Sequence, residues 1–384
     1  MIKSRLEGGD CVKIVSIEPT PSPNSMKINL SEELPAGDTR QYKLETDLTN
    51  APPYIQKLMA VPGVKGLYHV MDFIALERNA KYAWEDILPG AREAFGEVVE
   101  EYKASEQASE DFGEIKVSIQ MFRGIPMQVK LEEGESEQRF GLPERFMQAA
   151  MKASSASENM VMERQWKEQN PRYGSPEEIG QEVTEEIAAT YSEERLEALV
   201  KAAFSDQSES IKQEKKVVTL AMLDDADWKV RYAALDRMDP ELTDLPVLEK
   251  ALQDEKASVR RLSVVFLGMI ESKEVLPLLY QALKDKSVTV RRTAGDCLSD
   301  LGFVEAIPEM IESLQDRNKL VRWRAAMFLY EVGDETAIPA LEQAANDPEF
   351  EVKMQAGMAL ERIKGGEEAK GSVWHQMTQA RKSN

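Results

Sequence analysis

A phrase of three residue types recurs at a fixed spacing through residues 216–365, and it constrains the fold more than any other feature. A Val-Arg pair appears four times, and Val352-Lys353 follows as a fifth copy, so that successive valines lie 29, 31, 31 and 31 residues apart. Self-similarity with this period indicates stacked structural repeats. The residues that recur are Val230, Val259, Val290 and Val321; Arg231, Arg260, Arg291 and Arg322; Asp254, Asp285, Asp316 and Asp347; and Pro246, Pro277, Pro308 and Pro339.

The third copy, residues 286–316, predicts a pair of helices. Its first apolar residues fall on one helical stripe, and Gly302 then interrupts the pattern where a helix C-cap is expected. Pro308 suits the first turn of a second helix, because N–H groups there lack helical partners. One such pair cannot bury its apolar faces alone, so neighbouring copies must stack. We expect an all-α solenoid of about five repeats over residues 216–365.

The repeated aspartates and arginines have two interpretations. In the structural one, each Asp caps a helix in the turn between repeats and pairs with an Arg of an adjacent repeat. In the other, the arginines form a ladder for an anionic ligand. We favour repeat stacking, because periodic residues serve periodic geometry.

The Asp-x-x-x-x-Val-Arg phrase and the proline of the second helix resemble the short HEAT-like repeats first noted in phycobilin lyases. The resemblance implies a solenoid with a surface for a protein partner. It implies no bilin chemistry, since a fold does not determine a function.

Residues 11–104 predict a small α+β domain with helices over a mainly antiparallel sheet. Strands are expected near residues 11–17, 26–30, 64–70 and 73–76, and helices from Pro53 and from Trp84 to Tyr102. Glu18–Lys27, Pro62–Lys65, Asp72–Ile74 and Trp84 resemble the N-terminal domain of Nfu-type iron–sulfur scaffold proteins. In that family a Cys-x-x-Cys pair in a separate module holds the cluster. This chain has no such pair, so the resemblance implies a link to iron–sulfur assembly without cluster binding.

The Thr-Pro-Ser-Pro-Asn-Ser loop presents Asn24 and Ser25 as tentative contacts for a partner. Turn chemistry explains the same residues, because Pro fixes φ and Asn and Ser satisfy the backbone locally. We favour turn chemistry.

Residues 112–212 predict a middle α+β domain. Two alternating runs flank Arg123-Gly124 as a hairpin would, an acidic loop is expected over Glu132–Gln138, and helices are expected from Leu142 and from Ser175. Met121–Lys130, Leu142–Phe146 and Arg164–Trp166 resemble the middle domain of the Gram-positive family called conserved virulence factor C. That family joins an Nfu-like domain, this middle domain and HEAT repeats in the same order. Its name implies an effect on virulence-factor expression and names no reaction.

Composition narrows the function. Cys11, Cys297, His69 and His375 are too few and too scattered for a zinc or iron–sulfur site, so we expect no metal and no cofactor. The net charge is −20 and no region is net basic, which makes nucleic acid an improbable partner. No apolar run approaches the length of a membrane helix. We expect a cytoplasmic protein that ends in a flexible tail over residues 366–384.

The sequence contains none of the familiar catalytic motifs, so we assign no catalytic residue. We expect a non-enzymatic adapter or scaffold whose repeats bind a protein, with an accessory role in iron–sulfur assembly that involves assembly proteins or their clients. The first alternative is a lyase or hydrolase that uses a groove between the solenoid and the middle domain. The second is a regulator of virulence-factor expression through protein contacts.

Overall fold

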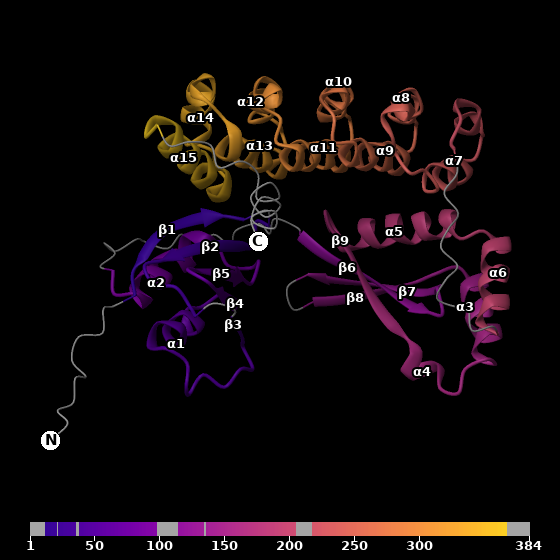
Figure 1. The fold of residues 1–384 in the computed structure, drawn as a ribbon, viewed down its shortest axis with the longest axis horizontal. Helices are drawn as coiled ribbons and strands as arrows, with labels where there is room; N and C mark the ends of the chain where they lie inside the picture. The colour runs from indigo at the N-terminus through magenta and orange to yellow at the C-terminus, as the bar shows by residue number, and fades with distance from the viewer. Residues whose placement is uncertain are drawn as a thin grey trace. The chain divides into compact units, whose positions relative to one another are not determined.

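A computed structural model describes residues 12–20, 22–35, 38–97, 114–133, 136–204 and 217–366 (Figure 1). The chain divides into two compact units: residues 1–112 with 347–354, and residues 113–346 with 355–384. The second sheet and most of the helical repeats thus share one unit. The expected domain junctions at 104–112 and 212–216, and the expected tail from residue 367, lie outside the described residues.

The first unit is a small α+β fold built on an antiparallel five-stranded sheet of order β1-β2-β5-β4-β3. This confirms the fold class expected for the N-terminal part. Its elements are β1 (Ile14–Pro19), β2 (Ser25–Leu30), β3 (Thr39–Lys43), α1 (Pro53–Ala60), β4 (Val64–Val70), β5 (Phe73–Arg78) and α2 (Trp84–Ala94).

One sheet face and both helices of this unit enclose its core. Alternation along β2 buries Met26, Ile28 and Leu30, while the residues between them are only half-buried. Helices α1 and α2 contribute their apolar faces to the same cluster, with Ile55 and Ile87 fully buried. Two layers of this kind bury the apolar face of each element against the other.

Two expectations for this unit need correction. Strand β3 was not expected, because Thr39–Lys43 is a polar edge strand that carries one aromatic residue and no apolar alternation. Helix α2 ends at Ala94 rather than at Tyr102. Gly96 follows with a φ of 84°, the left-handed conformation that commonly ends helices.

Acidification should destabilise this unit through His69. The side chain is 2% exposed, neither ring nitrogen has a hydrogen-bond partner within the described residues, and Arg40 lies directly opposite on β3. Burial first, and then the charge of Arg40, lower the pKa of His69 below its ordinary 6.5. The unfolded chain therefore binds the proton first as the pH falls through 6.5. We expect stability that is complete above that pH and declines from pH 7 to 5.5, by at most about 1.4 kcal/mol per pH unit.

Urea denaturation at a series of pH values measures this slope. It is best done in a His375→Gln background, which leaves His69 as the only histidine. His69→Phe should flatten the profile between pH 7 and 5.5. An unchanged slope in that variant would assign the pH dependence to other groups.

The second unit opens with an antiparallel four-stranded sheet of order β8-β7-β6-β9. The expected hairpin at Arg123-Gly124 is confirmed, with a positive φ at both residues as a two-residue turn of this kind requires. Ser175 also caps a helix as expected, since its hydroxyl accepts from the Glu178 N–H. The elements are β6 (Glu114–Phe122), β7 (Ile125–Glu133), β8 (Ser136–Gly141), α3 (Glu144–Ser154), α4 (Met160–Glu163), β9 (Gln165–Tyr173), α5 (Pro176–Thr190) and α6 (Glu193–Ala203).

Both edge strands of this sheet differ from expectation. Most of the expected acidic loop, Glu132–Gln138, is strand, because β7 continues to Glu133 and β8 begins at Ser136. Strand β9 was not expected at all. The exposed edges of a sheet carry polar side chains on both faces, so neither segment shows the alternation that marks a half-buried strand.

The repeats form pairs of helices around a continuous core, which confirms the all-α solenoid. Each repeated proline is the second residue of a short helix, and Gly302 ends α11 with a φ of 64°. Figure 1 shows α8, α10, α12 and α14 in one row and the longer α9, α11 and α13 in another. The helices are α7 (Trp228–Leu235), α8 (Leu245–Ala251), α9 (Ala257–Met269), α10 (Leu276–Leu283), α11 (Val288–Leu301), α12 (Ile307–Ser313), α13 (Lys319–Val332), α14 (Ile338–Ala344) and α15 (Phe350–Lys364).

Candidate functional site

The repeated arginines and aspartates join successive repeats through buried, bidentate ion pairs, here called the arginine–aspartate ladder. Arg260 on α9 donates from Nε and Nη2 to the two carboxylate oxygens of Asp285, at 2.7 and 2.9 Å. Its Nη1 donates to the carbonyl of Asp254 in its own repeat at 2.7 Å. The described ladder pairs are Arg231 with Asp254, Arg260 with Asp285, and Arg291 with Asp316.

The ladder aspartates lie in the turns between repeats but do not cap the helices as expected, because the N-cap residues of α9, α11 and α13 are Lys256, Ser287 and Asn318. Asp285 Oδ1 accepts the N–H of Ser287 at 2.7 Å. In the same way Asp254 accepts the N–H of Lys256, and Asp316 accepts that of Asn318. Arg322 makes the same bond within its own repeat as Arg260 does, because its Nη1 donates to the carbonyl of Asp316 at 2.9 Å. The guanidinium groups of Arg231, Arg260 and Arg291 are thus occupied by protein acceptors, which supports a stacking role and leaves no donor edge for a ligand.

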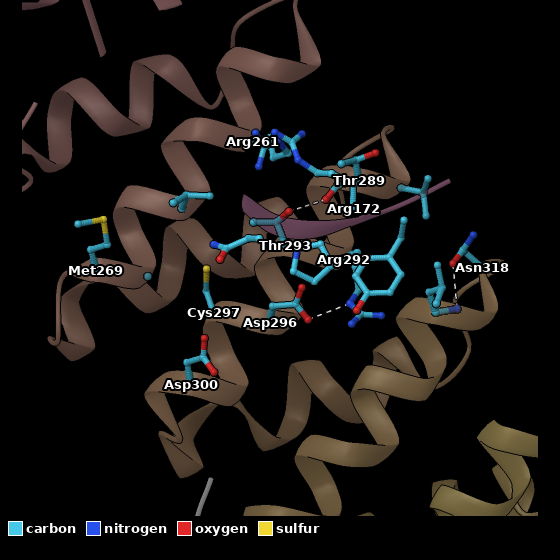
Figure 2. A pocket seen from close by; sticks show the side chains of 17 residues that line it. Arg172, Arg261, Met269, Thr289, Arg292, Thr293, Asp296, Cys297, Asp300 and Asn318 are labelled. Carbon is cyan, nitrogen blue, oxygen red and sulfur yellow. Dashed lines mark hydrogen bonds and ion pairs between the residues drawn. The ribbon is translucent and has the colours of Figure 1, made fainter. Parts of the chain in front are cut away.

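A pocket of about 320 Å³ lies beside the ladder in the second unit, where the end of β9 meets α9, α11 and the start of α13 (Figure 2). The residue after each ladder arginine lies about 100° further around the same helix. In the second and third repeats that residue is Arg261 or Arg292, and both line the pocket. Strand β9 contributes Arg172 and Tyr173 from the opposite side.

One wall of the pocket is a buried charge cluster on Glu186 of α5. Its carboxylate accepts from Arg172 Nη2 at 2.7 Å and from Arg261 Nη2 at 3.1 Å. Burial alone would raise the pKa of Glu186, but the charges of Arg261 and Arg172 outweigh burial and lower the pKa below its ordinary value. The cluster therefore stays ionised and ties α5 and β9 to α9.

Arg292 differs from the three paired ladder arginines. It is 3% exposed, and its Nε donates to Asp296 Oδ1 at 2.8 Å. Its guanidinium carbon lies 4.2 Å from the ring centre of Tyr173 and 5.3 Å from that of Trp323. Its two terminal nitrogens, Nη1 and Nη2, are buried and make no hydrogen bond within the part of the chain that the structure describes.

The acids of the pocket lie one helical turn apart on α11. Asp296 Oδ1 also lies 2.7 Å from Arg324 Nε, so one oxygen is shared by two guanidinium groups. Asp300 stands at the exposed rim, where desolvation, opposed by Arg324, raises the pKa of its carboxyl. Solvent at the rim limits that shift.

The thiol of Cys297, also on α11, is no nucleophile. It is buried, it donates to the carbonyl of Val264 at 3.4 Å, and burial raises the pKa of the thiol far above its ordinary value.

The loop residues Asn24 and Ser25 lie in the first unit and make internal contacts. Asn24 Oδ1 accepts from Arg78 Nε at 3.2 Å, and the Ser25 hydroxyl pairs with that of Thr20. Both residues are half-buried. This geometry favours turn chemistry, and a partner contact at Asn24 and Ser25 stays a proposal.

The sequence interpretation missed the pocket residues although it singled out their neighbours. Position by position, the residue after the ladder arginine is Tyr232, Arg261, Arg292 or Trp323, so it varies while the ladder does not. Stacking of the repeats does not require one residue type at this position. Its side chain can therefore make a specific contact. That signal was present in the repeats.

The described residues contain neither a metal site nor a membrane helix. Among them, no three or more His, Cys, Asp or Glu side chains are placed to hold a metal ion. No described helix is both long and apolar enough to cross a bilayer.

Comparison with family models divides the chain into three matched regions. Residues 15–102 match the model described as scaffold protein Nfu/NifU N terminal, and residues 120–200 match the one described as virulence factor. Residues 216–295 and 276–361 match HEAT repeats. The order is the one that the resemblance implied.

Similar proteins come from Gram-positive bacteria. The chain is 62% identical to protein YpgR of Bacillus subtilis (strain 168), over 97% of this chain and 99% of that one. It is 43% identical to conserved virulence factor C of Staphylococcus haemolyticus (strain JCSC1435), over 69% of this chain and 71% of that one. Among solved structures, protein SAV1430 from Staphylococcus aureus is 38% identical, covers 22% of this chain and 98% of its own length, and has a TM-score of 0.21.

Proposed function

The chain belongs to the conserved virulence factor C family, and from this premise we propose that it is a non-enzymatic adapter that binds a protein through its HEAT repeats. The observation that carries the proposal is the union, in one chain, of an Nfu-like unit with a repeat solenoid. A solenoid offers a long surface for a partner, and the ladder fixes the geometry of that surface from repeat to repeat.

We further propose that the adapter serves iron–sulfur assembly without holding a cluster. The Nfu-like unit supports the link to assembly. The sequence supports the second part, because its two cysteines, Cys11 and Cys297, are far apart and no Cys-x-x-Cys occurs. Cys297 is buried with a raised thiol pKa, and thiolate is the form that binds metal.

Affinity capture with cross-linking in Bacillus subtilis tests this function. The tagged full-length chain should recover iron–sulfur assembly proteins or cluster-containing clients, identified by mass spectrometry. A variant with a disrupted first unit, Trp84→Ala, should lose those proteins if that unit selects them. Arg317→Ala, which changes an exposed residue of the solenoid, serves as the matched control. Recovery of neither class of protein by the wild-type chain would contradict the proposal.

One observation favours the enzyme alternative, and it is the pocket with two aspartates on α11. A hydrolase would need one of them as general base or acid. Asp296 is held by Arg292 and Arg324, which leaves Asp300 as the candidate. Any turnover that depends on this pocket should therefore be lost in Asp300→Asn, and turnover that survives the substitution would remove this alternative.

An effect on virulence-factor expression, which the family name implies, would follow from the adapter's choice of protein partner and needs no separate site.

A further inference from the structure

The pocket contains hydrogen-bond donors that the protein itself does not use. The Nε edge of Arg292 is occupied by Asp296, so the guanidinium presents its Nη1–Nη2 end, and both nitrogens are buried without a partner in the described residues. Arg261 Nε, on a residue that also lines the pocket, likewise makes no hydrogen bond in the described residues, and Arg172 Nη1 makes none either but lies 3.7 Å from Glu182 Oε2. All of this unused capacity is donor capacity.

Buried donors without partners are unusual enough to require an explanation. Native proteins pair nearly all buried polar atoms, and a charged group left unpaired costs more than a neutral one. The chain is able to satisfy such a group, as the neighbouring Arg291 demonstrates: its side chain donates to Asp316 and to the carbonyl of Asp285. Other buried donors of the described chain also lack a partner, but Arg292, the next residue on the same helix, combines two unpaired terminal nitrogens with a place in the pocket wall.

The shape of the free edge selects the ligand's acceptor. Nη1 and Nη2 point their N–H groups in the same direction from a planar group, and this fork matches two oxygens of one carboxylate or phosphate. The guanidinium carbon lies 4.2 Å from the ring centre of Tyr173 and 5.3 Å from that of Trp323, and both terminal nitrogens are covered, so a ligand reaches this fork only when a side chain of the pocket wall moves. A Lys side chain could supply the charge at this position but not the fork.

The charge of the pocket favours a single negative charge over two. Asp296 is shared by Arg292 and Arg324, Glu186 pairs with Arg172 and Arg261, and Glu182 also pairs with Arg172. With Asp300 at the rim, four carboxyl groups face four guanidinium groups. A dianion would meet these acids without an excess of cations to balance it. A monoanion with two oxygens needs only the free edge of Arg292.

The remaining walls suit a small ligand with an apolar body. Val265, Val288 and Leu320 line the pocket together with Tyr173, and its neutral polar side chains are those of Asn170, Thr289, Thr293 and Asn318 (Figure 2). A volume of about 320 Å³ is at the lower end of the range of small-molecule sites.

We propose that this pocket binds a small monocarboxylate, with the carboxylate bidentate on Arg292 Nη1 and Nη2 and the apolar body against Tyr173, Val288 and Leu320. This site is separate from the arginine–aspartate ladder, and it does not depend on the proposed adapter function.

Isothermal titration calorimetry of the full-length chain with sodium benzoate tests the proposal. Benzoate combines one carboxylate with one flat apolar body, and a ligand of this size should bind with a Kd on the order of 1 mM. Arg292→Lys keeps the positive charge and removes the fork, so it should weaken binding by at least about 10-fold. Arg317→Gln, on the exposed turn before α13, should leave the affinity unchanged.

A second variant keeps the test valid if Arg292→Lys disturbs folding. Asn318 caps α13 by accepting the N–H of Leu320 at 2.9 Å, and Asp is an equally good cap. Asn318→Asp therefore preserves the helix while it adds a negative charge to the pocket. It should weaken benzoate binding by about 3- to 10-fold, whereas the neutral cap variant Asn318→Ser should not. Thermal melts establish that each variant is folded.

Three further ligands define what would overturn the proposal. Benzamide, a neutral isostere, should bind at least about 10-fold more weakly than benzoate, and equal binding would exclude carboxylate recognition. Inorganic phosphate that binds more tightly than benzoate would exclude the monoanion. N-acetyldiglycine carries its carboxylate at the end of a peptide and has no apolar body. If it binds more tightly than benzoate, the ligand is a peptide C-terminus, and the proposed apolar body is wrong. Absence of benzoate binding, or binding unaffected by Arg292→Lys and Asn318→Asp, would overturn the site itself.

Discussion

Replacement of Arg260 by alanine should destabilise the solenoid by about 3–5 kcal/mol, the cost of breaking a buried ion pair from one side. The substitution leaves the Asp285 carboxylate, 12% exposed, without its two strongest donors. It also leaves the carbonyl of Asp254 without the Nη1 donor. The loss should appear in urea denaturation followed by far-ultraviolet circular dichroism, because the helices give most of that signal.

Arg317→Ala is the matched control for this prediction. Arg317 is exposed and makes one hydrogen bond, to the carbonyl of Lys286 at 3.2 Å. Its removal should change the free energy of unfolding by less than about 0.5 kcal/mol. A loss below about 1 kcal/mol in Arg260→Ala would mean that the ladder contributes little to stacking, and the arginines would then need another explanation.

Removing both partners of a ladder pair measures how much the pair contributes to the free energy of unfolding. It excludes the cost of leaving one buried charge without its partner. Apolar replacement of a buried pair is often neutral or stabilising when the volume is kept. We therefore expect Arg260→Met with Asp285→Leu to recover part of the stability lost in Arg260→Ala. The recovery should be incomplete, because the Ser287 N–H also loses Asp285 as its acceptor.

The second large effect is expected at Trp84 in the first unit. Trp84→Ala should destabilise that unit by about 3–5 kcal/mol, because the side chain is fully buried and its loss leaves a large cavity. The indole Nε1 donates to the carbonyl of Pro23 at 2.8 Å, and the ring lies 5.3 Å from the guanidinium of Arg78. The side chain therefore holds the loop of residues 22–25 onto the core.

Trp84→Phe divides this effect into its parts. The phenyl ring keeps much of the packing and cannot donate to Pro23, so the cost should fall to about 1–3 kcal/mol. Trp166→Ala is the control, because Trp166 lies on the edge strand β9 and is 38% exposed. Urea denaturation followed by tryptophan fluorescence measures all three. If Trp84→Ala and Trp166→Ala cost the same, Trp84 does not anchor the loop.

The predictability of each element followed from how its residues are constrained. Strand β2 and the hairpin of β6 and β7 were predictable because one buried face imposes alternation on the sequence. Strands β3 and β9 were not, because an edge strand is held by backbone hydrogen bonds that any polar residue can make. Because backbone groups make these hydrogen bonds, the side chains of an edge strand need not alternate between apolar and polar.

The candidate site divides in the same way. The ladder residues were recognisable because similar interfaces between repeats require the same partners every 29 to 31 residues. The pocket residues come from β9, α9 and α11, which lie far apart along the chain. No periodicity links Tyr173 to Arg292, and only their approach in space gives the pair a meaning.

Arg291 and Arg292 are neighbours in the sequence, but the sequence determines the role of the first and the tertiary structure that of the second. The sequence by itself determined that a solenoid forms and that Arg291 belongs to its repeating framework, because stacking copies of one unit forces the same residues to recur. Only the tertiary structure decided that Arg292 differs. Successive residues on a helix diverge by about 100°, so Arg291 meets the aspartate of the next repeat while Arg292 turns toward β9 and ends with a buried, unused pair of donors.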